Sequence, residues 1–198
     1  MGRIRAVFAS RNPGKLRELM ALLPDWEIEP VGDLELPPET GETFYENAAV
    51  KARFAHELDP SRWGIGEDSG LEVEALGGAP GIRSARFAGE KAGDEENLAK
   101  LLQVLGARPP EERRARYVSE LVVLDPDGAE LRGSGTLEGE IATEPRGTGG
   151  FGYDPVFVPV GETRTVGELG DDWKREHSHR AAAARALAAR VGGAREEM

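Results

Sequence analysis

Two short segments, far apart in the sequence, hold the residue types best suited to chemistry. Residues 67–70 (EDSG) place two adjacent carboxylates after an apolar stretch, and residues 149–154 (GGFGYD) place two aromatic side chains and an acid among glycines. Carboxylate oxygens are hard ligands of the kind Mg²⁺ prefers. Aromatic faces stack on flat rings. The two segments therefore indicate a site for metal and phosphate and a site for a base.

The acid pair is expected at the end of a strand, because residues 63–66 and 71–73 read as short strands on either side of it. Clefts of α/β proteins form at strand ends. Side chains alternate along a strand, so only one acid can face a given side, and Asp68 is favoured. Glu39 and Glu42 could add a further carboxylate. The alternative for residues 67–70 is a solvated turn, and the alternative for Glu39 and Glu42 is a plain acidic loop.

Residues 10–15 (SRNPGK) lie between an apolar run and a helical pattern of leucines that ends at Pro24. Backbone N–H groups in such a turn, together with the helix dipole, form an anion site, to which Lys15 would add a charge. The segment is not a Walker A loop, because Ala9 replaces the first glycine and Leu16 follows the lysine. An ordinary turn with a solvated lysine is the alternative.

A capping box of Thr43 and Glu46 predicts a helix that runs to about Leu58. Asn47 and Lys51 are one turn apart on this helix and share a face. Lys51 can therefore reach a phosphate, or it can lie along the surface as an ordinary lysine.

Four glycines fall within residues 147–155, which also hold Phe151, Tyr153 and Asp154. Each aromatic face stacked on a base contributes about 1–3 kcal/mol, and the acid can accept from a ring N–H. A second cluster contains Lys174, His177, Ser178, His179 and Arg180. Its donors suit a purine carbonyl, and helix capping with solvated charge is the alternative.

The remaining pattern predicts an α/β protein with a single domain over residues 1–198. Strands are expected at 4–9, 117–124, 130–139 and 156–158, with a turn at 125–128, and helices at about 16–23, 44–58, 97–105 and 179–191. Helices and strands alternate at first and a long hairpin follows. We therefore expect a mixed sheet with helices packed on it.

Composition limits the partners. The 198 residues carry a net charge of −11, which argues against a nucleic-acid polymer but not against a single nucleotide. The absence of cysteine excludes disulfides and thiolate catalysis. No apolar run approaches the roughly 20 residues of a membrane span, and no signal-peptide pattern is present. We expect no membrane partner and a cytoplasmic location.

Taken in order, these motifs resemble the inosine triphosphate pyrophosphatase (Ham1) family over nearly the whole chain, from Phe8 to about Ala189. Seven segments carry the resemblance: residues 10–15, 39–52, 68–71, 77–81, 84–87, 147–155 and 178–180. The departures are Ser10, where threonine is commoner, Arg11, where glycine is frequent, and Glu67, where many members have aspartate.

The resemblance implies a two-lobed α/β fold with an elongated mixed β-sheet flanked by helices, a cleft between lobes, and usually a homodimer. It implies hydrolysis of ITP, dITP and XTP to the nucleoside monophosphate and pyrophosphate, with Mg²⁺. Asp68 is then the catalytic acid that binds the metal and activates water, and Glu39 and Glu67 are further candidate metal ligands. The candidate phosphate-binding residues are Ser10, Arg11, Asn12, Pro13, Gly14, Lys15, Lys51, Ser69 and Lys174. The candidate base-binding residues are Phe151, Gly152, Tyr153, Asp154, His179 and Arg180.

Discrimination of ITP and XTP from ATP would follow from the purine C6 position. The C6 carbonyl of hypoxanthine or xanthine can accept from His179 and Arg180, whereas adenine presents a donor there. Two other functions remain open. A Maf-like nucleotide pyrophosphatase would share the metal but lack such a pair of donors. A catalytically silent nucleotide sensor would keep Phe151 and Lys15 but would not need Asp68.

Overall fold

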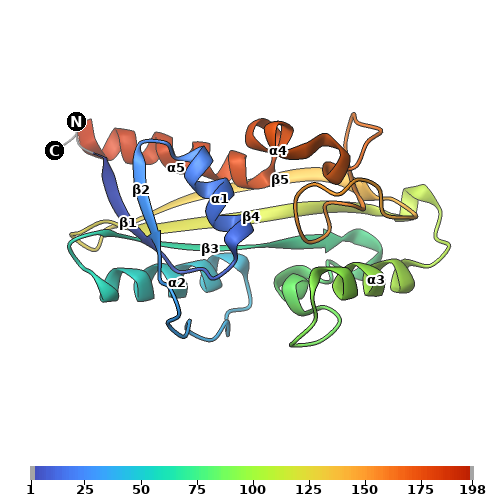
Figure 1. Ribbon diagram of the computed structural model, residues 1–198, viewed down its shortest axis with the longest axis horizontal. Coiled ribbons are helices and arrows are strands. Elements are labelled where there is room, and N and C mark those ends of the chain that lie inside the picture. Colours follow the sequence, from blue (N-terminus) through green and yellow to red (C-terminus); the bar gives the residue numbers. More distant parts are fainter. Residues whose placement is uncertain (1–2, 197–198) are drawn as a thin grey trace. The chain divides into compact units, whose positions relative to one another are not determined.

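The computed structural model describes residues 3–196 and contains one mixed sheet of six strands (Figure 1). The sheet has the order β2-β1-β3-β4-β5-β6. Its strands are β1 (Ile4–Phe8), β2 (Trp26–Pro30), β3 (Trp63–Val73), β4 (Arg114–Leu124), β5 (Glu130–Ile141) and β6 (Phe157–Pro159). β1 pairs in parallel with β2 and β3, whereas β5 and β6 are antiparallel. The predicted mixed sheet is confirmed.

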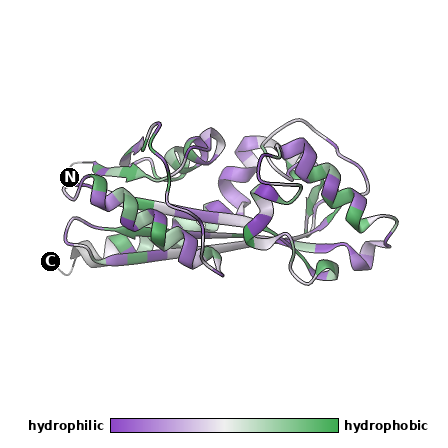
Figure 2. Ribbon diagram, turned by 90° about the horizontal axis from the view of Figure 1, so that it is seen from below, coloured by the Kyte–Doolittle hydropathy of each residue, from purple (hydrophilic) through white to green (hydrophobic). Residues whose placement is uncertain are grey.

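Five α-helices are present in the described part of the chain: α1 (Pro13–Leu22), α2 (Phe44–Leu58), α3 (Asp94–Leu105), α4 (Val166–His177) and α5 (His179–Glu196). Figure 2 shows apolar and polar residues interleaved along these helices, as expected of helices that cover a sheet on one side and meet water on the other. None of the described helices is long and apolar enough to cross a membrane.

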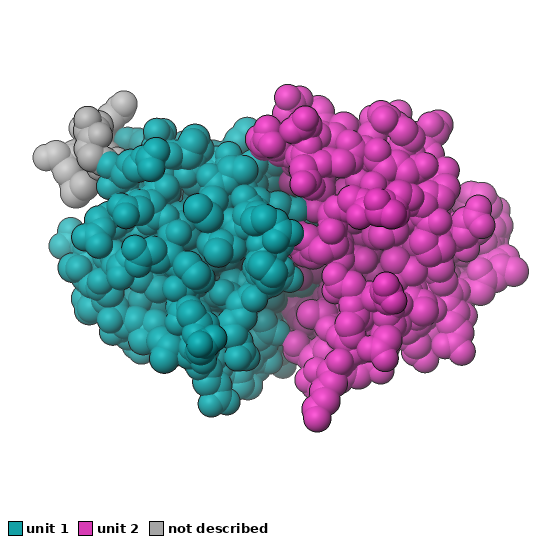
Figure 3. Space-filling view, viewed as in Figure 1, with its two compact units in different colours: residues 1–68, 119–135, 179–198 teal, residues 69–118, 136–178 magenta. Residues whose placement is uncertain are grey.

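The chain divides into two compact units (Figure 3). Unit 1 contains Met1–Asp68, Ser119–Gly135 and His179–Met198, and unit 2 contains Ser69–Val118 and Thr136–Ser178. The single domain expected from the sequence remains a prediction.

Unit 1 has helices on both faces of its strands. Leu121 and Val123 of β4 join the core that contains residues of α1 and α5, whereas Val122 and Leu124 pack with α2. The alternation of a strand therefore places α1 and α5 on one face and α2 on the other. Unit 2 has its own core, which joins Leu101 and other residues of α3 to apolar residues of β3, β4, β5 and α4.

One predicted break in the sheet is wrong. Residues 63–66 and 71–73 belong to a single continuous strand, β3, so the acid pair lies in the middle of a strand and not at its end. Both acids are almost fully buried, and each has charged partners on its own face. Extended pairing can continue through two adjacent carboxylates because their charges are neutralised locally.

Two elements have no counterpart in the prediction, β2 and α4. α3 also begins three residues before the predicted start, because the N3 carboxylate of Glu96 accepts from the backbone N–H of Gly93 and caps the helix there.

Candidate functional site

Glycines in β3 allow α2 to approach the strand closely. A Cβ placed on Gly66 would lie 2.0 Å from the carbonyl oxygen of Ala48 and 2.4 Å from the backbone nitrogen of Ala52. Any larger residue at position 66 would push the helix away. The close approach places Asn47 and Lys51 over β3, beside Asp68.

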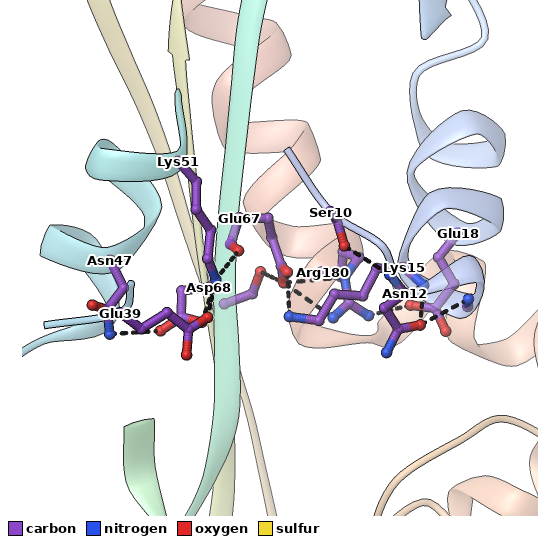
Figure 4. A network of polar contacts seen from close by, with 12 residues as sticks. Ser10, Asn12, Lys15, Glu18, Glu39, Asn47, Lys51, Glu67, Asp68 and Arg180 are labelled. Carbon is purple, nitrogen blue, oxygen red and sulfur yellow. Dashed lines mark hydrogen bonds and ion pairs between the residues drawn. The ribbon is translucent and has the colours of Figure 1, made fainter. Parts of the chain in front are cut away.

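Asp68 lies at the centre of a polar cluster on the α2 face of β3 (Figure 4). Its Oδ1 is 3.1 Å from Lys51 Nζ, and its Oδ2 accepts from Asn47 Nδ2 at 3.2 Å. Lys51 Nζ also donates to the carbonyl oxygen of Glu67 at 3.2 Å and forms an ion pair with Glu39. Two carboxylates from separate segments therefore converge on one buried ammonium group.

Burial sets the electrostatics of this cluster. Burial raises the pKa of Asp68, and the positive charges of Lys51 and Lys15 oppose that rise. For Lys51, burial alone would lower the pKa, but the carboxylates of Asp68 and Glu39 outweigh it and the pKa is raised. The lysine is therefore charged, and its predicted alternative as an ordinary surface lysine is wrong, since it is only 6% exposed.

Glu67 points to the opposite face of β3, towards α1 and α5 (Figure 4). Its Oε2 is 2.7 Å from Lys15 Nζ, and its Oε1 accepts from Arg180 Nη2 at 3.0 Å and from Ser119 Oγ at 3.1 Å. Arg180 forms a second ion pair with Glu18 of α1. Glu67 and Arg180 are 1% and 2% exposed, so they form a buried ion cluster.

The two faces separate the acids that the sequence grouped together. Within residues 3–196, no group of three acidic or histidine side chains is placed to hold a metal ion. The expected set of Glu39, Glu67 and Asp68 is therefore not assembled as one ligand group, because strand alternation turns Glu67 away. Glu39 and Asp68 remain together.

The loop before α1 uses much of its own hydrogen-bonding capacity. Asn12 Oδ1 accepts from the backbone N–H groups of Gly14 at 2.8 Å and Lys15 at 3.1 Å, and Ser10 Oγ accepts from the N–H of Asn12 at 3.2 Å. Pro13 has no N–H. The expected backbone anion site is therefore largely occupied by an ordinary N-cap. Any anion binding by this loop would rest mainly on side chains.

Residues 149–154, the aromatic loop, are organised by Asp154 in unit 2. Its Oδ2 accepts from the backbone N–H of Phe151 at 3.0 Å and from Lys174 Nζ at 2.7 Å, and its Oδ1 accepts from the Tyr117 hydroxyl at 3.2 Å. Lys174 Nζ lies 4.6 Å from the centroid of the Phe151 ring. Lys174, expected at a phosphate, therefore lies beside the aromatic ring.

The two aromatic residues of the loop differ in their surroundings. Phe151 is partly exposed, whereas Tyr153 is buried and donates its hydroxyl to the carbonyl oxygen of Ser84 at 2.8 Å. Burial raises the pKa of Tyr153, and the charge of Asp94 adds to the rise. Tyr153 therefore anchors the loop, and Phe151 is the ring available for stacking. Gly150 has a φ of 75°, in the left-handed region that favours glycine, and a Cβ there would also lie 2.0 Å from Asp154 Oδ2.

The remaining predicted residues lie at the start of α5, on β3 and in the loop before α1. Gly135 allows α5 to approach β5, since a Cβ there would lie 2.2 Å from the carbonyl oxygen of His179. His179 is buried, Ser69 follows Asp68 half-buried, and Arg11 is exposed.

Four partners of the site were not found by sequence reasoning: Glu18, Asp94, Tyr117 and Ser119. Glu18 shares a helix face with Lys15, but its partner in the site is Arg180, 162 residues away. All four residues join segments that are distant in the sequence, and no local pattern marks their contacts.

Fold and site together define an α/β protein in which two adjacent buried acids each pair with a lysine on their own face of β3, and which has a separate aromatic loop. Residues 6–190 match the model of the Ham1 family. The chain is 45% identical over 185 residues to the dITP/XTP pyrophosphatase of Bdellovibrio bacteriovorus, covering 90% of this chain and 93% of that one. It is 44% identical over 189 residues to the dITP/XTP pyrophosphatase of Escherichia coli K12, covering 92% and 95%.

Solved structures agree. A Ham1 protein from Coxiella burnetii superposes with a TM-score of 0.84 at 38% identity, covering 96% of this chain and 99% of that one. The Staphylococcus aureus Ham1 protein gives a TM-score of 0.83 at 39% identity, covering 96% and 98%. The chain belongs to the Ham1 family.

Proposed function

We propose that this protein hydrolyses the non-standard purine nucleoside triphosphates ITP, dITP and XTP to the nucleoside monophosphate and pyrophosphate. The observation that carries the proposal is the convergence of Asp68 and Glu39 on the ammonium group of Lys51, in a chain whose relatives are named for this activity. A buried acid beside a fixed cation suits the activation of water at a phosphate group.

The donor set fits a divalent ion such as Mg²⁺. Glu39 and Asp68 supply carboxylate oxygens that are already gathered around one positive charge, and Mg²⁺ is commonly held by one or two carboxylates together with substrate phosphates and water. When bound there, the ion would neutralise phosphate charge and polarise the attacked phosphorus. We assign Glu67 to the buried ion cluster and not to the metal.

The residues around the acid then have separate roles. Asp68 accepts the proton of the attacking water. A bond forms between the water oxygen and the α-phosphorus, while the bond from that phosphorus to the bridging oxygen breaks and its electron pair leaves with pyrophosphate. Lys51 and Lys15 place positive charge near the phosphates, and Asn47 holds the carboxylate of Asp68 in position.

We assign the base to the aromatic loop, where Phe151 stacks on the purine and Lys174 places a cation at the same ring. His179 and Arg180 are retained as proposed readers of the C6 carbonyl. For Arg180 this role competes with its ion pairs to Glu67 and Glu18. We also propose a homodimer and a cytoplasmic location, both on the family resemblance.

The test is incubation with ITP, XTP, dITP, GTP and ATP, with Mg²⁺ or with EDTA, while pyrophosphate and orthophosphate are measured separately. We expect pyrophosphate from the first three nucleotides only, and only with the metal. In H₂¹⁸O the label should appear in the monophosphate, because attack is at the α-phosphorus. Orthophosphate as the main product, or equal turnover of ATP, would exclude the proposal. Asp68→Asn is the inactive control. Sedimentation of the purified chain tests the dimer.

A further inference from the structure

We propose that Asp94, the first residue of α3, is a positioning residue that holds the aromatic loop in the conformation that presents Phe151 to the base. The inference rests on the proposed function, because that function assigns the loop to the base. Neither the sequence motifs nor the family match gives Asp94 a role.

The contact is short and is made to the peptide next to the stacking ring. The backbone N–H of Gly152 donates to Asp94 Oδ2 at 2.7 Å, across 58 residues of sequence. Gly152 has a φ of 63°, in the left-handed region that favours glycine. The bond therefore stabilises a turn that places Phe151 on one side and the buried Tyr153 on the other.

Two carboxylates hold consecutive amides of this loop. Asp154 accepts from the N–H of Phe151 and Asp94 accepts from the N–H of Gly152. The Asp154 carboxylate is buried, with Lys174 and Tyr117 as further partners. Asp94 is exposed and reaches the loop from a separate helix. Asp94 thus adds a contact from α3 to the Gly152 amide, beside those that Tyr153 and Asp154 make within unit 2.

α3 is a rigid support for this contact. Its first turn is capped by Glu96, which accepts from Gly93 N–H at 2.8 Å. Buried Asn97 accepts from Ala88 N–H at 2.8 Å and donates to the carbonyl oxygen of Ala85 at 3.0 Å. Leu101 is fully buried in the core of unit 2. Because these contacts do not involve Asp94, its replacement should leave the helix in place and release only the loop.

Three variants separate positioning from general effects of charge. Asp94→Ala removes the acceptor, and Asp94→Asn keeps a neutral acceptor of the same shape. Glu95→Gln is the matched control, since Glu95 is an exposed acid in the same first helical turn, where negative charge favours the helix.

We expect Asp94→Ala to raise KM for ITP by about three- to tenfold with kcat nearly unchanged, because a stack formed equally in the ground and transition states affects only binding. Inhibition by inorganic tripolyphosphate, which has no base, should stay within about twofold of the wild type. Asp94→Asn should recover most of the loss, and Glu95→Gln should match the wild type.

Hydrogen exchange of the Gly152 amide, followed by NMR, gives a readout that does not depend on activity. It should be faster in Asp94→Ala than in the wild type and in Glu95→Gln. If the wild type does not hydrolyse ITP, the proposed function fails while this exchange measurement still reports the contact. Unchanged exchange and KM in Asp94→Ala, or an equal loss of affinity for ITP and tripolyphosphate, would overturn the proposal.

Discussion

Arg180 lies where two interpretations conflict, and one substitution separates them. The sequence places Arg180 at the base, whereas in the structure its guanidinium pairs with Glu67 and Glu18 at 2% exposure. Arg180→Gln would remove the guanidinium from the carboxylate of Glu67, which is 1% exposed and keeps its contacts with Lys15 and Ser119. Removing one member of a buried ion pair costs about 3–5 kcal/mol.

We take the lower end, about 3 kcal/mol, because Glu67 keeps Lys15. For a chain of this size 1 kcal/mol shifts Tm by about 2–4 °C, so Arg180→Gln should lower Tm by roughly 6–12 °C. Thermal unfolding followed by circular dichroism measures this. The matched control is Arg108→Gln, which breaks an exposed pair with Glu112, and its Tm should move by about 2 °C or less.

The double variant Arg180→Gln/Glu67→Gln should be more stable than the sum of the single effects, because Glu67→Gln removes the buried carboxylate charge that Arg180→Gln deprives of its guanidinium partner. Equal Tm shifts in Arg180→Gln and Arg108→Gln would refute the reasoning. If Arg180→Gln changed the ratio of kcat/KM for ITP to that for ATP but left Tm unchanged, Arg180 would act in base recognition and not in stability.

Three further predictions concern the face of β3 that carries Asp68. In a pyrophosphate-release assay Asp68→Asn should lower kcat by about 10²–10⁴-fold, while a binding titration still detects the nucleotide. Glu67→Gln should lower kcat less. Near-normal turnover of Asp68→Asn at saturating Mg²⁺ would contradict the assignment of Asp68. Burial raises the pKa of Asp68, so on acidification its active ionised form should be lost at a pH above the ordinary aspartate pKa of about 3.9. Added Mg²⁺ should shift the midpoint of the pH profile of kcat/KM to lower pH. A midpoint below about pH 3.9 without excess metal would count against this role of Asp68. Gly66→Ala should lower stability by about 1–3 kcal/mol and reduce activity, because the new Cβ would meet the backbone of α2 at 2.0 Å. Gly192→Ala, in open space within α5, should leave activity unchanged and raise stability by up to about 1 kcal/mol. Equal denaturation midpoints of the two variants in urea would refute the steric argument.

Local patterns predicted much of this molecule correctly. The capping box of Thr43 and Glu46 is present, α2 ends at Leu58 as expected, and Asn47 and Lys51 share the face that contacts Asp68. The hairpin between β4 and β5 also forms. These features depend on contacts within about four residues or on strand alternation, so the sequence specifies them directly.

The missed features depend on packing between distant segments. Arg180 is 113 residues from Glu67, and Tyr117 is 37 residues from Asp154. Which carboxylate a buried cation meets is decided by how close the helices approach the sheet, and that is set here by glycines such as Gly135. The predicted break in β3 failed for a related reason. Two adjacent acids indicate a solvated turn only if no partners neutralise them, and the partners come from other elements.

The alternation of β3 gives its two adjacent acids different tasks. Asp68 faces α2 and the amine of Lys51, while Glu67 faces α1 and α5 and fixes Lys15. Burial raises the pKa of Asp68, and the charge of Lys15 opposes that rise from the other side of the strand. A residue that anchors the lysine thus also adjusts the acid next to it. A shift of one residue in the register of β3 would exchange the two faces, placing Glu67 beside Lys51 and Asp68 among the ion-cluster partners. The close fit of Gly64 and Gly66 against α2 opposes such a shift, since the residues that a slip would bring to that face carry side chains that the helix backbone cannot accommodate.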